Sequence, residues 1–146
     1  MTIIRLLPHH APLMAEVERL CFPVPWTVGM IRSELESDLT YYIAAMENGR
    51  LLGYAGMESV LDEGHINNVA VDPAFRRRGI ASVLVCRLIT RARELELSFL
   101  TLEARVSNVG ARALYERLGF AGQGIRRGYY ETPKEDAVIM TLRFLG

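Results

Sequence analysis

The sequence predicts an α/β protein built around a single mixed β-sheet. At its centre lies a strand–helix–strand unit, with a strand over residues 66–71, an amphipathic helix over 79–97 and a second strand over 98–104. Two strands that are joined through a helix run parallel to each other in one sheet. Hairpin patterns on both sides of this unit add antiparallel strands, so we expect a mixed sheet with flanking helices.

The first part of the chain supplies one short strand and two helices. Residues 2–7 are rich in β-prone side chains, and Pro12 suits the first turn of the helix that follows. The apolar positions of this helix recur at helical spacing, at Leu13, Val17 and Leu20. The proline-containing segment 22–26 ends the helix, and Thr27 is placed to cap the next one.

Three strands come next. Residues 41–46 and 51–57 have strand-like patterns, and Asn48-Gly49 between them favours a tight hairpin turn. The third strand, over 66–71, stops at Asp72-Pro73, because proline has no N–H group to donate to a sheet.

From residue 79 the hydrophobic period changes from that of a strand to that of a helix. Apolar residues recur at every third or fourth position up to Leu97, which predicts an amphipathic helix of about five turns. After the strand 98–104, Ser107 or Asn108 caps a further helix, which Gly119 ends. The chain closes with two strands, over 120–127 and 137–144.

Length and composition indicate one globular domain. The chain has 146 residues, of which 50% are hydrophobic, and a chain of this size buries an ordinary core without a disulfide or a metal. We therefore expect a single domain over residues 1–146. Its longest uncharged stretch, 20–31, is too short to span a bilayer. Cys21 and Cys86 lack the spacing of a zinc site or a disulfide framework, which favours a cytoplasmic protein without membrane contact.

The charges balance overall but are unevenly distributed. The chain carries 17 basic and 17 acidic residues, which argues against direct binding of nucleic acid. Residues 1–73 contain 4 basic and 10 acidic side chains, whereas residues 74–146 contain 13 and 7. This fits a basic half that faces an anionic ligand and an acidic half that faces a basic partner. It fits equally well a scatter of charges over solvated surfaces.

The segment 71–82 has the features of a phosphate-binding helix start. A strand ends at Val71, three arginines follow at 76–78, and a helix begins at Gly79 with small residues. The first turn of a helix presents unpaired backbone N–H groups and the positive end of the helix dipole, and both attract phosphate. Common nucleotide-binding fingerprints are absent. Phosphate binding and an ordinary solvated helix start both remain open at this point.

Residues 76–81, Arg-Arg-Arg-Gly-Ile-Ala, resemble the (Gln/Arg)-x-x-Gly-x-(Gly/Ala) motif of the GCN5-related N-acetyltransferases. Further matching segments are NVAVDP at 68–73, LEARVSN at 102–108, ALYERLGF at 113–120, RRGYY at 126–130 and EDA at 135–137. Together with the Phe-Pro and Pro-Trp pairs near the start, these segments resemble the RimI subfamily over residues 2–144. The chain departs from the pattern in having Arg76, Ala81 and an additional Val24.

The resemblance implies a fold and a donor site. It implies the GNAT fold, a mixed sheet of six to seven strands whose two central parallel strands splay apart, with acetyl-CoA bound in the opening and no metal. The backbone of Val69, Ala70 and Val71 is implied to bind the pantetheine arm. The residues implied around the pyrophosphate are Arg76, Arg77, Arg78, Gly79, Ile80, Ala81 and Ser82. Asn108 is implied as a further contact of the donor.

The resemblance also implies catalytic roles. Acetyl transfer to an amine needs a neutral nucleophile, stabilisation of an oxyanion and a way for the thiolate to leave. Glu103 is implied as the general base, acting through water, and Tyr115 as the general acid near the departing sulfur. A backbone N–H near Val71 is implied as the oxyanion donor. From spacing alone, Glu103 also fits a solvated strand position and Tyr115 a core tyrosine.

The implied acceptor is the N-terminal alanine of small-subunit ribosomal protein eighteen. An α-amino group with a pKa of about 7.7–8.0 is roughly 10–15% neutral at pH 7, whereas a lysine is only about 0.04% neutral, so an N-terminus is the easier nucleophile. Trp26, Tyr129 and Tyr130 are candidates for the wall of the peptide groove, and each also fits a packing role.

The remaining alternatives concern the histidines and the class of function. His9, His10 and His65 show no spacing that indicates a triad or a metal site, and we expect them at the surface. Three other functions fit the sequence: an acetyltransferase of the same fold that acts on a small amine or a lysine, a non-catalytic acyl-CoA-binding module, and an interaction domain whose arginines bind acidic partners.

Overall fold

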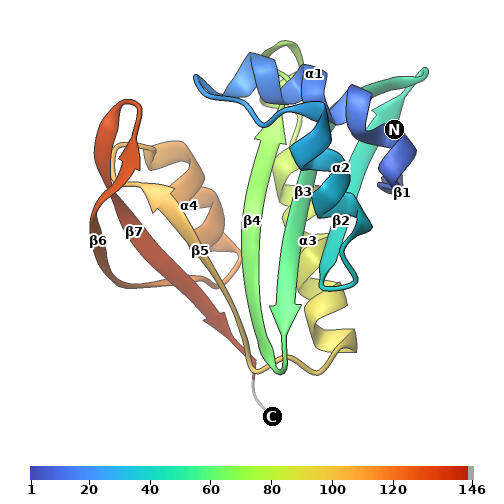
Figure 1. The fold of residues 1–146 in the computed structure, drawn as a ribbon. Coiled ribbons are helices and arrows are strands. Elements are labelled where there is room, and N and C mark those ends of the chain that lie inside the picture. The colour runs from blue at the N-terminus through green and yellow to red at the C-terminus, as the bar shows by residue number, and fades with distance from the viewer. Residues whose placement is uncertain (145–146) are drawn as a thin grey trace.

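The computed structural model describes residues 1–144 and contains a seven-stranded mixed sheet flanked by helices (Figure 1). The strands are β1 (Thr2–Arg5), β2 (Thr40–Glu47), β3 (Arg50–Val60), β4 (Glu63–Val71), β5 (Phe99–Arg105), β6 (Ala121–Glu131) and β7 (Lys134–Arg143). Their order across the sheet is β1-β2-β3-β4-β5-β7-β6. The predicted α/β class with a mixed sheet is confirmed, and β4 and β5 form its central parallel pair.

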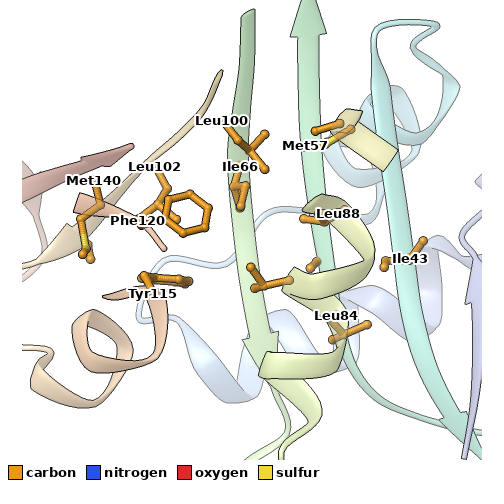
Figure 2. Packing of buried hydrophobic residues seen from close by; sticks show 14 of the residues in the cluster. Ile43, Met57, Ile66, Leu84, Leu88, Leu100, Leu102, Tyr115, Phe120 and Met140 are labelled. Atoms are coloured by element: carbon orange, nitrogen blue, oxygen red, sulfur yellow. The ribbon is translucent and has the colours of Figure 1, made fainter. Parts of the chain in front are cut away.

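Helices cover both faces of the sheet (Figure 1). The helical elements are η1 (Pro8–His10), α1 (Ala11–Cys21), α2 (Val28–Glu36), η2 (Pro73–Phe75), α3 (Ile80–Glu94) and α4 (Val109–Arg117). One buried cluster joins α1 and α2 to the sheet, and a larger one joins α3 and α4 to the opposite face. In the larger cluster Tyr115 lies beside Phe120 at the side of α4, next to the core that Leu84 and Leu88 of α3 form (Figure 2).

Local signals in the sequence set the ends of these elements. The Thr27 side chain accepts a hydrogen bond from the Met30 N–H at 3.1 Å and starts α2, as predicted. At the first hairpin Asn48 and Gly49 have φ angles of 51° and 76°, which a tight turn between two strands requires. Asn108, rather than Ser107, caps α4 by accepting from the Ala111 N–H at 3.1 Å.

Two local predictions were wrong. Leu20 is 56% exposed, because the face of α1 that meets the sheet is formed by Met14 and Val17. The strand predicted to end at residue 127 continues as β6 to Glu131. A register irregularity accommodates this extension, and the Gly128 N–H donates to the Asp136 carboxylate at 2.7 Å there.

The central parallel strands separate after three residue pairs. β4 and β5 are in register only over residues 63–65 and 99–101. Beyond this point β4 stays paired with β3 as far as Val71, and β5 stays paired with β7 as far as Arg105. The two halves of the sheet therefore diverge toward the ends of β4 and β5 (Figure 1), and the predicted splay is confirmed.

Candidate active site

Two adjoining cavities occupy the opening between β4 and β5. The larger cavity has a volume of about 680 Å³ and reaches the start of α3. The smaller cavity has a volume of about 480 Å³ and reaches the hairpin of β6 and β7. The two share a set of lining residues: Cys21, Phe22, Val69, Asn108, Ala111 and Tyr115. A molecule in one cavity therefore meets a molecule in the other at Val69 and Tyr115.

The backbone of β4 faces the larger cavity where the sheet opens. The Asp72 N–H donates to the Leu52 carbonyl of β3 at 2.8 Å. Because backbone groups alternate in direction along a strand, Val69 and Val71 direct theirs away from β3 and toward β5. Pairing with β5 has ended before Val69. The Val71 carbonyl is met there by the Cys21 thiol at 3.3 Å and by Arg76 Nε at 3.3 Å.

The start of α3 forms the far wall of the larger cavity. Gly79 is the N-cap residue with φ of 74°, a left-handed conformation that glycine adopts without a steric penalty. Gly79, Ile80, Ala81 and Ser82 all line the cavity. The first backbone N–H groups of this 15-residue helix lie beside the cavity, as the sequence predicted.

The three arginines before α3 differ in their surroundings. Arg76 and Arg77 line the larger cavity. The Arg78 guanidinium instead donates to Glu47 at 3.1 Å and lies over the Phe75 ring, 5.7 Å from its centroid. Arg78 is therefore not among the residues that line the larger cavity, and its charge is held by an acidic residue of β2 that no local motif indicates.

Tyr115 lies where the two cavities meet. It projects from α4, and its ring packs edge-on against Phe120 with 5.9 Å between centroids. Burial raises the pKa of Tyr115 to about 12. Its hydroxyl therefore stays protonated at neutral pH and can donate a hydrogen bond. Tyr115 is part of the buried core and also lines both cavities, so its position is compatible with a packing role and with a catalytic role.

Glu103 lines the smaller cavity and is paired with a histidine. Its Oε2 lies 2.6 Å from His65 Nε2, and its Oε1 lies 3.8 Å from a guanidinium nitrogen of Arg126. The side chain of Glu103 is 10% exposed. The His65 hydrogen bond lowers the pKa of Glu103, and the same bond raises the pKa of His65.

The prediction for His65 was wrong. This residue is half-buried and bound to an acid, whereas the sequence suggested a surface histidine outside any triad or metal site. His65 and Glu103 are 38 positions apart, so no spacing rule relates them. The register of β4 and β5 brings the two residues together, because His65 is paired with Thr101, and Glu103 is the next residue on the same face of β5.

The residues expected in the peptide groove divide into two groups. Tyr129 and Tyr130 line the smaller cavity, and the Tyr130 hydroxyl donates to the Glu103 carbonyl at 3.2 Å. Trp26 lines neither cavity. Its side chain packs against the α1–α2 cluster, and its backbone N–H donates to the buried Glu18 at 3.1 Å, so the structure corrects this expectation. Phe22 and Pro23, which belong to the resemblance but were not named as site candidates, line the smaller cavity instead.

Comparison with known proteins places the chain in a family. Residues 11–120 match the family described as Acetyltransferase (GNAT) family. The chain belongs to the GNAT family. This confirms the resemblance read from residues 76–81 and the segments around them, and the family uses acetyl-CoA as its acetyl donor.

Individual GNAT relatives cover almost the whole chain. The ribosomal protein bS18-alanine N-acetyltransferase of Escherichia coli (strain K12) is 37% identical over 144 residues, which is 97% of this chain and 96% of the relative. The protein of the same name from Haemophilus influenzae is 34% identical and covers 86% of each chain. The crystal structure of the ribosomal-protein-S18-alanine N-acetyltransferase from Escherichia coli superposes with a TM-score of 0.91 at 34% identity, covering 99% of this chain and 96% of that one.

Two further observations concern membrane-spanning helices and metal sites. None of the helices within residues 1–144 is long and apolar enough to cross a membrane. In the same range, no group of three or more His, Cys, Asp or Glu side chains is arranged to hold a metal ion.

Proposed function

We propose that this chain transfers the acetyl group of acetyl-CoA to the N-terminal amine of a protein, and that its substrate is the N-terminal alanine of ribosomal protein bS18. The relatives that cover 86–99% of the chain carry that activity in their names. The observation that carries the proposal is the opening between β4 and β5, where Glu103 and Tyr115 both line the smaller cavity and Tyr115 also lines the larger one.

The larger cavity fits the acetyl donor. Acetyl-CoA supplies an acetyl group as a reactive thioester. The outward-facing backbone of Val69 and Val71 suits an extended amide-containing arm, as a further strand would. The N–H groups from Arg77 to Ser82 suit a pyrophosphate, since they lie at the positive end of α3. Arg76 adds charge beside them, and Asn108 lines the cavity from the opposite side.

The smaller cavity fits the acceptor. Its walls include Tyr129 and Tyr130, whose rings suit an extended peptide, and Glu103 at its inner end. A terminal ammonium with a pKa of about 7.7–8.0 must lose a proton before it attacks, and a carboxylate is a suitable acceptor for that proton, directly or through water. Glu103 is assigned this role as general base.

Tyr115 is assigned to the leaving group. Full transfer of its proton to a thiolate whose conjugate thiol has a pKa of about 8.5 would be uphill by about 5 kcal/mol when the tyrosine has a pKa of about 12. A hydrogen bond from the neutral hydroxyl stabilises the departing thiolate without that cost. The N–H of Val71 is assigned to the oxyanion that forms on the other side of the acetyl carbon.

One peptide assay tests the proposal. Purified protein and acetyl-CoA are incubated with a peptide that begins Ala-Arg, with its N-terminally blocked copy, and with a blocked peptide that contains lysine. Mass spectrometry should find one added acetyl group on the free peptide and none on the other two. Modification of the lysine peptide alone would indicate a side-chain acetyltransferase. Binding of acetyl-CoA without turnover would indicate a binding module, and absence of both would contradict the donor site as well.

A further inference from the structure

A chain of side-chain hydrogen bonds leads away from Glu103 on the α2 face of the sheet. Glu103 Oε2 lies 2.6 Å from His65 Nε2, and His65 Nδ1 lies 2.7 Å from Asn67 Oδ1. Asn67 Nδ2 donates to Glu34 Oε1 at 2.9 Å, and the Tyr42 hydroxyl donates to the same oxygen at 3.0 Å. The chain therefore connects β5, β4, α2 and β2, and Glu103 is at its end in the smaller cavity.

This arrangement fixes which nitrogen of His65 carries a proton. The Glu34 carboxylate can only accept, so the nitrogen of the Asn67 amide must face it. The Asn67 oxygen then faces His65 Nδ1, and because a carbonyl oxygen also only accepts, Nδ1 must be protonated. In a neutral imidazole with a protonated Nδ1, Nε2 carries a lone pair.

The 2.6 Å contact between His65 and Glu103 therefore needs one additional proton. A lone pair on Nε2 facing an ionised carboxylate oxygen would be repelled at this distance. One proton between the two atoms turns the contact into a charge-assisted hydrogen bond. When that proton leaves, the bond is lost, and the ionised Glu103 faces a neutral histidine.

We propose that His65 is a positioning residue for the deprotonation of the substrate amine: it shares one proton with Glu103, so that the two side chains take up the proton of the amine as a unit. This inference rests on the proposed role of Glu103. In the step, the ammonium loses one proton and the pair gains one, which gives a neutral amine and the hydrogen-bonded pair seen in the structure.

Charged groups of both signs lie around the pair. Glu58 of β3 and Glu34 of α2 are the other acidic groups on the side of His65, and Arg126 of β6 faces Glu103. The hydrogen bond to Glu103 keeps the pKa of His65 above its usual value of 6.5. A proton acceptor with a pKa above 6.5 is nearer in pKa to the α-amine than a lone carboxyl is, so the proton transfer is less uphill in free energy.

A comparison of pH profiles tests the role of His65. kcat/KM for an Ala-Arg peptide is measured from about pH 5.5 to about pH 8.5 with the wild-type protein, His65→Gln and the exposed His9→Gln as a matched control. Glutamine can still donate to Glu103 but does not titrate. The ratio of the wild-type kcat/KM to that of His65→Gln should rise about tenfold per pH unit below the pKa of the pair and then level off. The ionisation of the peptide amine affects both proteins equally and therefore cancels in this ratio.

The control variant and the other outcomes distinguish failure of the inference about His65 from failure of the proposed function. The ratio of wild type to His9→Gln should be constant across the range. A constant ratio for His65→Gln as well would mean that His65 is merely structural and would overturn the inference while the proposed function stands. No turnover by the wild-type protein on any peptide would overturn the proposed function, and the role of His65 with it.

A second measurement does not depend on activity. NMR titration of the His65 ring should give a midpoint above 6.5 in the wild-type protein and a lower midpoint in Glu103→Gln. Asn67→Ala should lower the midpoint too, because the ring is then free to place its neutral proton on Nε2 and donate to Glu103. Equal midpoints in the three proteins would overturn the shared proton, even if His65→Gln failed to fold.

Discussion

The two cavities between β4 and β5 differ in the groups that line them. The larger cavity presents backbone at two places, the edge of β4 at Val69 and Val71 and the first turn of α3 after Gly79. The smaller cavity presents side chains with specific partners, above all Glu103 with His65 and Tyr130. The donor side thus depends on the path of the main chain, and the acceptor side on the charge and position of a few groups.

This difference predicts how the two sides respond to substitution. On the acceptor side, removal of one charged or hydroxyl group should reduce turnover strongly with little effect on donor affinity. On the donor side, a side-chain change should matter only where it alters a backbone angle or removes a charge that faces the cavity. The four predictions below run from the largest expected effect to the smallest.

The largest effect is expected for Glu103→Gln. This substitution keeps the shape of the side chain but removes the proton acceptor, so kcat/KM for an Ala-Arg peptide should fall about 10²- to 10³-fold. The dissociation constant of acetyl-CoA, measured by calorimetry, should stay within about twofold, because Glu103 lines only the smaller cavity. Unchanged turnover at neutral pH would remove Glu103 as the base.

Tyr115→Phe should have the next largest effect. The ring keeps its packing against Phe120, and only the hydrogen bond to the leaving thiolate is lost. A hydrogen bond to a charged group contributes about 2 kcal/mol, so kcat should fall about thirtyfold while KM for the peptide changes little. A loss of thermal stability in proportion to the loss of kcat would indicate that Tyr115 acts only in the core.

Gly79→Ala tests the backbone of the donor side. An added Cβ meets no atom within 4 Å, so any effect comes from the φ of 74°, which costs an L-residue about 1–2 kcal/mol. The affinity for acetyl-CoA should fall about five- to tenfold as the first turn of α3 shifts, with kcat at saturating donor preserved. Gly29→Ala in α2, where glycine needs no positive φ, is the matched control and should bind acetyl-CoA as the wild type does.

The smallest effects are expected for the arginines. Arg77→Gln should weaken acetyl-CoA binding about threefold at low salt and less at high salt, because an exposed charge is screened. Arg78→Gln should leave binding unchanged, because that guanidinium is paired with Glu47 away from the larger cavity. Equal losses in the two variants would show that the charge of the whole segment, rather than one side chain, attracts the donor.

The comparison of the two cavities also explains what could be predicted from the sequence. The donor side is contiguous in the chain: a strand end, a turn and a helix start within residues 69–82. Local rules predicted the helix start at Gly79 there, which is confirmed, and phosphate binding at that start stays a prediction. The splay of β4 and β5 came from the family resemblance, since no local pattern reports how far two strands stay paired.

The acceptor side is assembled across the sheet, and there the sequence was less informative. His65 and Glu103 meet only because β4 and β5 run parallel in one register. On the donor side, too, Arg78 is held by a distant residue, Glu47, which is 31 positions away. Trp26 belongs to the α1–α2 cluster because the N-terminal helices pack on the sheet face opposite α3. Each of these outcomes depends on tertiary neighbours rather than on spacing along the chain.

A crystal structure of the protein with coenzyme A tests the central claim most directly. Electron density should place the pyrophosphate on the backbone N–H groups at the start of α3 and the pantetheine arm along Val69 and Val71. The sulfur should lie beside Tyr115, at the junction with the cavity that holds Glu103. Coenzyme A bound elsewhere, or an opening between β4 and β5 that stays closed by the protein's own side chains, would contradict the account.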